Sequence, residues 1–247
     1  MPEPSGRRAS SSSITEKRYA SLQGDTESQG ASLEAERLTA QRGHATLFAD
    51  VSLAVRGGSA LVVTGRNGSG KTTLLRMLAG LTAPVAGEIR WRRSVTRPFD
   101  VRLRAAVAFN GHLPALKDEL TAEENLAQWV SLGDRPPASA AIRDALAAVA
   151  LERRRSLPVR LLSQGQRRRI GLARLRLSRR PLWILDEPLT ALDDEGVDVL
   201  HGLLETHLAG GGICVAASHQ PLPIARERQQ SLRLDADVSV LAGSAIQ

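Results

Sequence analysis

The chain has 247 residues and a formal net charge of +7, and 42% of its residues are hydrophobic but only 3% aromatic. This length fits one domain, or one domain with a subdomain, around a core of aliphatic side chains. No stretch approaches the ~20 apolar residues that a membrane-spanning helix requires, so a link to a membrane has to run through a partner. The positive charge favours anionic partners such as nucleotides, lipid head groups or nucleic acid, without selecting among them.

The N-terminal residues and the single cysteine indicate in which cellular compartment the protein is expected. Residues 1–31 are rich in serine, glycine, glutamine and charge, so we expect a disordered extension there. They lack the apolar segment of a secretory signal, and acids such as Glu3 and Glu16 argue against mitochondrial targeting. Cys214 lies in the apolar stretch 213–216, which predicts a buried, unreactive thiol and excludes an internal disulfide. We therefore expect a cytoplasmic protein.

From about residue 33 the hydrophobic pattern predicts alternating strands and helices. Leu74, Leu75 and Leu78 show the spacing of a helix, and Thr121 with Glu124 forms a capping box that begins another. In chain order, strands are expected at 48–55, 60–64, 87–93, 105–109, 182–186 and 213–218, and helices at 71–81, 121–132, 138–151, after 163 and at 194–208. Strands that alternate with helices imply an α/β fold with a largely parallel sheet.

Residues from about 112 to 180 differ from the rest because they contain predicted helices and no strand. We interpret them as a helical insert. The arginine runs 153–155, 167–169 and 179–180 are interpreted as solvated helix faces, the usual behaviour of charge runs. No internal repeat occurs, so one such unit is present.

Residues 65–72, Gly-Arg-Asn-Gly-Ser-Gly-Lys-Thr, match the phosphate-binding loop G-x-x-x-x-G-K-[ST]. The glycines let backbone N–H groups point at phosphate oxygens, and the following helix directs its positive end at the same anion. Lys71 is expected to neutralise the β- and γ-phosphates, and the Thr72 hydroxyl to ligate Mg²⁺. A plain strand-to-helix turn is the alternative, but the motif follows an apolar strand and opens a helix. We therefore predict that ATP with Mg²⁺ is bound by Gly65, Arg66, Asn67, Gly68, Ser69, Gly70, Lys71, Thr72 and Thr73.

The predicted strand at 182–186 ends in two carboxylates. Asp186 is placed to hold Mg²⁺, and Glu187, one residue further, can accept a proton from the attacking water. Paired acids at a strand end can also cap a helix, but Pro188 follows directly. With a phosphate-binding loop upstream, we interpret Glu187 as a catalytic base.

Residues 162–166, Leu-Ser-Gln-Gly-Gln, resemble the LSGGQ signature of ABC ATPases, with Gln164 in place of the first glycine. A serine hydroxyl and glycine N–H groups at a helix N-terminus form a second anion site. The resemblance implies a homodimer in which one chain contacts the ATP held by the other, through Ser163, Gln164, Gly165 and Gln166. It also implies a P-loop NTPase core of the RecA-like type, at 32–111 and 181–247, with a small antiparallel β element and a helical signature subdomain at 112–180.

Two more segments resemble functional elements of this family. Residues 189–193 are similar to the D-loop that crosses the dimer interface, and they end at Asp193. His219 follows the predicted strand at 213–218, where the family has a switch histidine that senses the γ-phosphate and holds the attacking water. A structural histidine is the alternative, but its place after a buried strand favours the switch. The resemblance therefore implies that Glu187 and His219 are the catalytic residues.

Two features of the family differ in this chain. His112 stands at the position of the Q-loop glutamine, and its role is open between coordinating water or Mg²⁺ and a structural one. The aromatic residue that stacks on adenine is absent from residues 40–44, so the base contact is expected from Arg42 or His44. His201 and His207 lie on a predicted surface helix and receive no functional role.

Four segments resemble the ATP-binding subunit of the bacterial cytochrome c maturation (haem exporter) complex: residues 111–126, 162–175, 182–192 and 219–222. This resemblance implies integral membrane subunits as partners, a peripheral location at the cytoplasmic face of the inner membrane, and ATP-driven haem export or release of a haem-loaded chaperone. A generic importer or exporter subunit is the alternative. A nucleic-acid-associated ABC protein is a third interpretation, motivated by the charge, but such proteins usually carry two cassettes or a long coiled-coil insertion, so no nucleic acid partner is expected.

Overall fold

The computed structural model describes residues 30–113, 115–131 and 138–234. The predicted N-terminal extension therefore lies outside the described residues except for Gly30 and Ala31. Ala31 is buried, and its carbonyl accepts a hydrogen bond of 2.8 Å from the Gly57 N–H.

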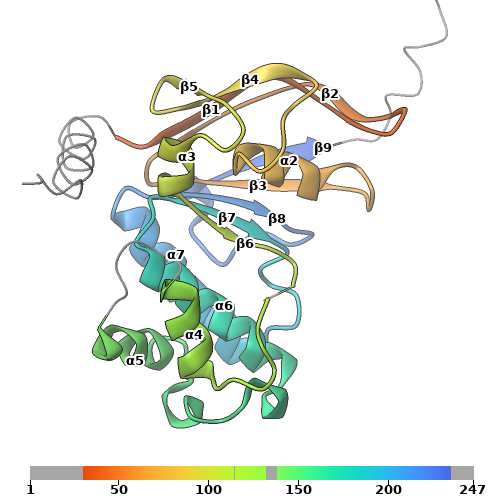
Figure 1. Ribbon diagram of the computed structural model, residues 1–247. Coiled ribbons are helices and arrows are strands. Elements are labelled where there is room, and N and C mark those ends of the chain that lie inside the picture. Colours follow the sequence, from red (N-terminus) through yellow and green to blue (C-terminus); the bar gives the residue numbers. More distant parts are fainter. Residues whose placement is uncertain (1–29, 114, 132–137, 235–247) are drawn as a thin grey trace, which may run out of the picture. The chain divides into compact units, whose positions relative to one another are not determined.

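A five-stranded parallel sheet forms the centre of the fold, with strand order β6-β7-β8-β3-β9 (Figure 1). In chain order its strands are β3 (Ala60–Gly65), β6 (Val107–Asn110), β7 (Leu182–Asp186), β8 (Ile213–Ala217) and β9 (Gln229–Leu234). Every residue of β7 and β8 is buried, as in a sheet covered on both faces. The expected parallel sheet is confirmed, and the carboxyl ends of β3, β8 and β7 lie side by side at one edge.

A four-stranded antiparallel sheet covers one face of the parallel sheet together with helix α2 (Figure 1). Its strands are β1 (Ser32–Arg42), β2 (Ala45–Arg56), β4 (Ala86–Trp91) and β5 (Ser94–Thr96), in the order β2-β1-β4-β5. Leu61 and Val63 of β3 face this layer, whereas Ala60 and Val62 belong to the core on the opposite face. This two-residue alternation divides the apolar side chains of one strand between two cores. The expected antiparallel β element is confirmed.

Within the described ranges the helices are α2 (Lys71–Leu78), α3 (Val101–Ala106), α4 (Ala122–Ser131), α5 (Ser139–Ala147), α6 (Gln164–Ser178) and α7 (Asp194–Ala209), with short 3-10 turns η1 (Glu152–Arg154), η2 (Val159–Leu161) and η3 (Arg226–Arg228). Helices α4 to α7 contribute to the second core. The predicted capping box of α4 is confirmed, since the Glu124 N–H donates to Thr121 Oγ1 at 3.1 Å and the Thr121 N–H to Glu124 Oε2 at 2.8 Å. Helices α4, α5 and α6 lie within the predicted helical insert, whose boundaries at 112 and 180 stay a prediction.

Several element ends differ from the sequence prediction for local reasons. Helix α2 ends at Leu78 rather than at residue 81, because Gly80 takes a φ of +69° and the Leu81 N–H bonds back to the Arg76 carbonyl at 2.8 Å. Residues 105–106 belong to α3 rather than to a strand, and Asp100 caps this helix by accepting from the Arg102 N–H at 2.8 Å. Helix α5 likewise ends at 147 rather than 151.

Strands β1, β5 and β9 were not predicted. Strand β1 was missed because a register shift between Ala35 and Leu38, with a positive φ at Arg37, interrupts its two-residue alternation. Strand β5 has only three residues, and β9 is largely polar and exposed, so neither carries a strong apolar alternation. Both are recognised only through their pairing, β5 with β4 and β9 with β3.

The interpretation of the run 167–169 as a solvated helix face is wrong, since Arg168 and Arg169 are 5% and 3% exposed. His207 is half-buried on α7: its ring stacks on Trp183 with centroids 3.9 Å apart, and its Nε2 lies 3.0 Å from the Ile213 carbonyl oxygen. Burial lowers the pKa of His207, which fits a structural role.

Cys214 is fully buried, and burial raises the pKa of its thiol to about 12, which confirms the predicted unreactive thiol. Along the parts of the chain that the structure describes, no helix combines the length and apolar character needed to cross a membrane.

Candidate nucleotide-binding and hydrolysis site

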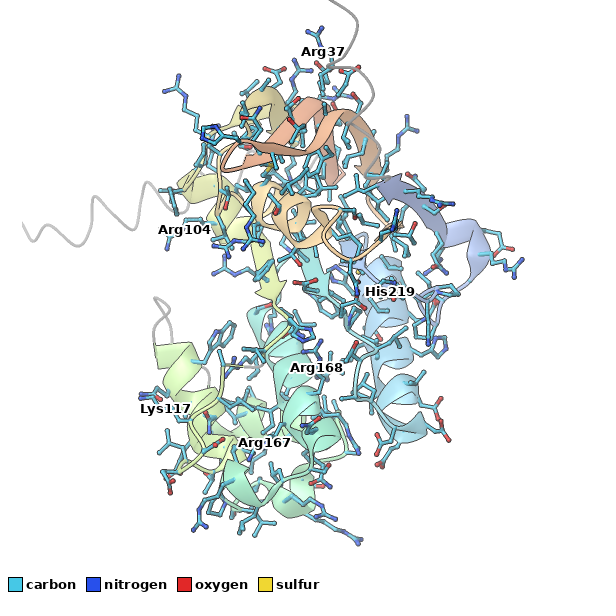
Figure 2. All side chains as sticks on the ribbon, turned by 90° about the vertical axis from the view of Figure 1, so that its right-hand side faces the viewer. Arg37, Arg104, Lys117, Arg167, Arg168 and His219 are labelled. Carbon is cyan, nitrogen blue, oxygen red and sulfur yellow. The ribbon has the colours of Figure 1, made fainter. Side chains whose placement is uncertain are left out.

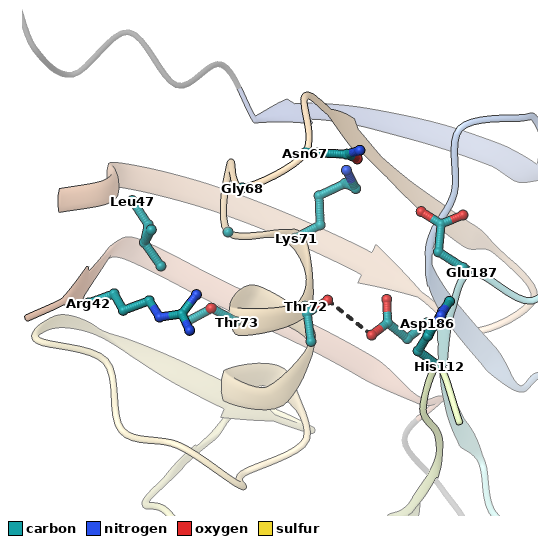
Figure 3. A pocket seen from close by; sticks show the side chains of 11 residues that line it. Arg42, Leu47, Asn67, Gly68, Lys71, Thr72, Thr73, His112, Asp186 and Glu187 are labelled. Atoms are coloured by element: carbon teal, nitrogen blue, oxygen red, sulfur yellow. Dashed lines mark hydrogen bonds between the residues drawn. The ribbon is translucent and has the colours of Figure 1, made fainter. Parts of the chain in front are cut away.

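The glycine-rich loop joins the carboxyl end of β3 to the start of α2 (Figure 3). Gly65 has a φ of +143°, and a Cβ there would lie 2.3 Å from the Leu234 carbonyl oxygen. Gly70 has a φ of +95°, and a Cβ there would lie 2.9 Å from a ring carbon of Phe48. Both positions therefore require glycine. No side chain caps the N-terminus of α2, so its first N–H groups are free to face an anion.

Lys71 and Ser69 present polar groups inside this loop. The Lys71 ammonium donates to the carbonyl oxygens of Gly65 at 2.8 Å and Arg66 at 3.2 Å. The Ser69 hydroxyl is buried and has no hydrogen-bond partner among the described residues. A buried polar group without a partner is costly, so this hydroxyl is suited to a phosphate oxygen.

Asp186 ends β7 beside the phosphate-binding loop. It is 5% exposed, and its Oδ2 accepts a hydrogen bond of 3.0 Å from the Thr72 hydroxyl. Two oxygen ligands side by side fit Mg²⁺, which prefers oxygen and is usually bound by one or two carboxylates together with substrate phosphates. Among the described residues, no cluster of three or more His, Cys, Asp or Glu is placed to hold a metal ion.

Glu187 follows Asp186 with a φ of +50°, a left-handed conformation that is uncommon outside glycine. Its N–H donates to the Ala217 carbonyl oxygen at 2.9 Å, which joins the ends of β7 and β8. Its carboxylate oxygen Oε1 lies 3.4 Å from His219 Nε2. The Glu187 side chain is 20% exposed and that of His219 56%, so both can reach a solvent-filled site.

One cavity of about 370 Å³ joins the glycine-rich loop to Asp186 and Glu187, whereas Ser69 and His219 do not line it (Figure 3). It is lined by Arg42, Leu47, Asn67, Gly68, Gly70, Lys71, Thr72, Thr73, His112, Asp186 and Glu187. Figure 3 shows Arg42 and Leu47 on the opposite side of the loop from His112 and Asp186. Of the two residues expected to contact adenine, Arg42 lines the cavity and His44 does not. Leu47 was missed, because it precedes the alternating pattern from which β2 was predicted.

The four signature residues lie at the start of α6 and do not line this cavity. The Gln166 N–H donates to Ser163 Oγ at 3.2 Å, and the Ser163 N–H donates to Gln166 Oε1 at 3.1 Å, so the two residues form a capping box. Gln164 is exposed in the first turn of the helix and has no positive φ, so this position does not require a glycine backbone. A Cβ on Gly165 would lie 3.0 Å from the Ala191 carbonyl oxygen, which keeps this residue small.

Asp193 is engaged within its own chain. Its Oδ1 accepts from the Gly196 N–H at 3.0 Å and caps α7, and its Oδ2 lies 3.1 Å from Arg169 Nη2. Arg169 also pairs with Glu195 at 2.7 Å. The predicted contact of Asp193 across a dimer interface stays a prediction.

Arg168 was missed as a residue of the site because its run of three arginines suggested a solvated face. It donates to the carbonyl oxygens of Gly111, His112, Asp186 and Glu187. Helical spacing could have found it, since Arg168, Leu172 and Leu175 share one buried face of α6.

A glycine-rich loop at one strand end and a carboxylate pair at the end of another define a P-loop nucleotide-hydrolase site. Residues 48–190 match the ABC transporter family. The chain is 46% identical over 202 residues to the cytochrome c biogenesis ATP-binding export protein CcmA of Dechloromonas aromatica, which covers 82% of this chain and 99% of the relative. It is 44% identical over 202 residues to the CcmA protein of Vibrio cholerae, with 82% and 98% covered.

Solved structures share the fold. The dimeric post-hydrolysis state of the ATP-binding cassette MJ0796 bound to ADP and Pi superposes with a TM-score of 0.72 at 23% identity, over 83% of this chain and 96% of that one. The ADP conformation of the cassette MJ1267 gives 0.70 at 17% identity, over 83% and 87%. The chain belongs to the ABC transporter family and, within it, to the cytochrome c biogenesis ATP-binding export proteins, which confirms the resemblance drawn from the sequence.

Proposed function

We propose that this chain is the ATP-hydrolysing subunit of an ABC complex for cytochrome c maturation, and that it couples hydrolysis to haem export or to release of a haem-loaded chaperone. The observation that carries the hydrolytic part is the cavity shared by Lys71, the Thr72–Asp186 pair and Glu187. The identity with cytochrome c biogenesis export proteins over nearly their whole length supports the biological part.

ATP binding exchanges contacts that the loop makes internally. The Lys71 ammonium gives up the carbonyl oxygens of Gly65 and Arg66 for phosphate oxygens, which are stronger partners because they carry charge. At the other side of the cavity, Arg42 and Leu47 receive the adenine base. The planar guanidinium of Arg42 can stack on the adenine ring, and so can replace the aromatic side chain that is absent from residues 40–44.

Hydrolysis uses the end of β7. Glu187 takes a proton from the attacking water, the water oxygen bonds to the γ-phosphorus, and ADP leaves. His219, 3.4 Å from Glu187, orients the carboxylate and the water. Thr72 and Asp186 would hold Mg²⁺, which when bound neutralises charge on the β- and γ-phosphates.

A second copy completes the site. The signature residues of one chain do not reach its own cavity, so they serve the cavity of a partner copy. Although Ser163 Oγ accepts from the Gln166 N–H, its own O–H remains available as a donor to phosphate. The N-terminus of α6 adds a favourable dipole for the anion, and Asp193 lies at the same interface.

The partners are integral membrane subunits, and the chain sits at the cytoplasmic face of the bacterial inner membrane. Leu113, 77% exposed and next to His112, supports an apolar contact surface beside the cavity. Contacts through the segment from His112 to Lys117 transmit the movement of the helical region to the membrane subunits.

Complementation tests this function. In a bacterium that lacks its own CcmA, the wild-type chain, co-expressed with its cognate membrane subunits, should restore covalent haem attachment to c-type cytochromes, and Glu187→Gln should not. If the wild-type chain hydrolyses ATP but fails to restore haem attachment, its cargo differs and the generic transporter interpretation holds. Membrane subunits that co-purify after detergent extraction identify the partner in either case.

A further inference from the structure

The guanidinium of Arg168 connects the two segments that follow the paired strands β6 and β7 beside the cavity. Its Nη1 donates to the carbonyl oxygens of Gly111 (3.5 Å) and His112, and its Nη2 to those of Asp186 (3.0 Å) and Glu187. Figure 2 shows Arg168 on α6, between the helices and the parallel sheet. One nitrogen therefore serves the segment after β6, and the other serves the end of β7.

This arrangement is specific to arginine. A buried charge is tolerated only where hydrogen bonds replace its hydration, and Arg168 is 5% exposed with four carbonyl acceptors. Burial lowers the pKa of Arg168, and the nearby carboxylates of Asp186 and Glu187 oppose that shift. The planar fork reaches both segments at once, whereas the single ammonium of a lysine cannot span them in the same way.

The hydrogen bond from Arg168 to the Glu187 carbonyl oxygen helps to fix the backbone from which the Glu187 carboxylate projects. Glu187 has a φ of +50°, which costs backbone energy and needs support from its surroundings. The Ala217 carbonyl oxygen binds the N–H of this residue, and Arg168 binds its carbonyl. Both sides of the unusual backbone are thus held, and the side chain projects from there toward His219.

The contact with His112 bears on the other wall of the cavity. His112 lines the cavity opposite the glycine-rich loop (Figure 3), and Leu113 beside it is 77% exposed. A displacement of this exposed segment would move the His112 carbonyl, to which Arg168 donates, and Arg168 also donates to the Glu187 carbonyl.

We propose that Arg168 is a positioning residue that sets the Glu187 carboxylate for hydrolysis according to the place of the His112 segment. The contacts that carry this role are the hydrogen bonds from the Arg168 guanidinium to two pairs of backbone carbonyl oxygens, one pair after β6 and one at the end of β7. The proposal rests on the hydrolytic function proposed above, because it assigns Arg168 a role only through Glu187.

Steady-state and single-turnover ATP hydrolysis by the purified full-length chain test this role with Arg168→Lys and Arg168→Gln. We expect kcat to fall by about 10- to 100-fold, since small misplacement of a reacting group has effects of this size. The KM for ATP should change by less than about two-fold, because Arg168 does not line the cavity. Arg176→Lys is the control, since Arg176 lies exposed on the same helix and does not line the cavity; its kcat should stay within about two-fold of wild type.

A double-mutant cycle separates positioning from a general structural role. If Arg168 acts through Glu187, Arg168→Gln should cost nothing further in a Glu187→Gln background. Unchanged kcat in both Arg168 variants, or additive losses in the cycle, would overturn the proposal. So would failure of both Arg168 variants to fold while Arg176→Lys folds, because Arg168 would then be a structural residue. Absence of ATP hydrolysis in the wild-type chain would instead refute the proposed function.

Discussion

Substitution of Glu187 by glutamine removes the proposed base while conserving shape. The side chain keeps its position 3.4 Å from His219 Nε2 and its neighbours at the ends of β7 and β8. Glutamine cannot accept the proton of the attacking water, and a positioned general base contributes about 10²- to 10⁴-fold to a rate. We therefore expect kcat to fall by that factor, which corresponds to about 3–5 kcal/mol of transition-state stabilisation.

ATP binding and dimer formation by Glu187→Gln should be retained or strengthened, in contrast to its loss of hydrolysis. Lys71, Thr72 and Asp186 are unchanged, and one negative charge beside the triphosphate is lost, so the Kd for ATP should stay equal or decrease. Because nucleotide is no longer consumed, a dimer should accumulate with ATP and Mg²⁺ and be visible by size-exclusion chromatography with light scattering.

The assay is phosphate release at saturating ATP, paired with equilibrium binding of ATP by calorimetry. Glu205→Gln is the control, because Glu205 pairs with Arg228 at 3.2 Å and neither residue lines the cavity. This substitution should leave kcat unaffected. Turnover of Glu187→Gln at the wild-type rate would show that Glu187 is not the base. Full-speed hydrolysis by a strictly monomeric wild-type chain would refute the role of the signature residues in a partner's site.

Four further predictions follow from single contacts. Lys71→Ala should weaken ATP binding at least about 10-fold by calorimetry, because charge-assisted bonds to phosphate are worth roughly 1.5–3 kcal/mol each; retained affinity would contradict the assigned loop. Arg42→Ala should raise the KM for ATP about 10-fold at constant kcat, the usual size of one stacking contact, whereas His44→Ala should leave KM unchanged, since only Arg42 lines the cavity. Gly65→Ala should destabilise the fold by at least about 2 kcal/mol in urea unfolding, because its Cβ would lie 2.3 Å from the Leu234 carbonyl oxygen at a φ of +143°. Cys214 should react with a thiol reagent at pH 8 only after unfolding, since its pKa of about 12 keeps the folded thiol protonated; fast labelling of the native chain would contradict its burial. Because the thiol of the unfolded chain has a lower pKa, near 9.0, the free energy of unfolding should fall as the pH rises above that value.

Much of the site was predictable because it depends on short stretches of chain. The glycine-rich loop, the carboxylates after β7 and the capping box at Thr121 involve residues only a few positions apart. The positions of β3, β7 and β8 were likewise predicted, since fully buried strands read as continuous apolar runs. The hydrophobic pattern also predicted the helix after Ser163, and the resemblance to the ABC family added the role of a second copy.

What the sequence by itself determined is therefore the identity of the chemical groups and the local turns that present them. The tertiary structure alone decided which groups meet: Arg42 and Leu47 line the cavity, His207 stacks on Trp183, and Arg168 is buried between two strand ends. The physical reason is that burial of a charged or aromatic side chain depends on partners distant in sequence. Helical spacing could place Arg168 on the buried face of α6, but the four carbonyls that stabilise it come from residues 56–57 positions before it and 18–19 positions after it, so no local pattern could reveal these partners.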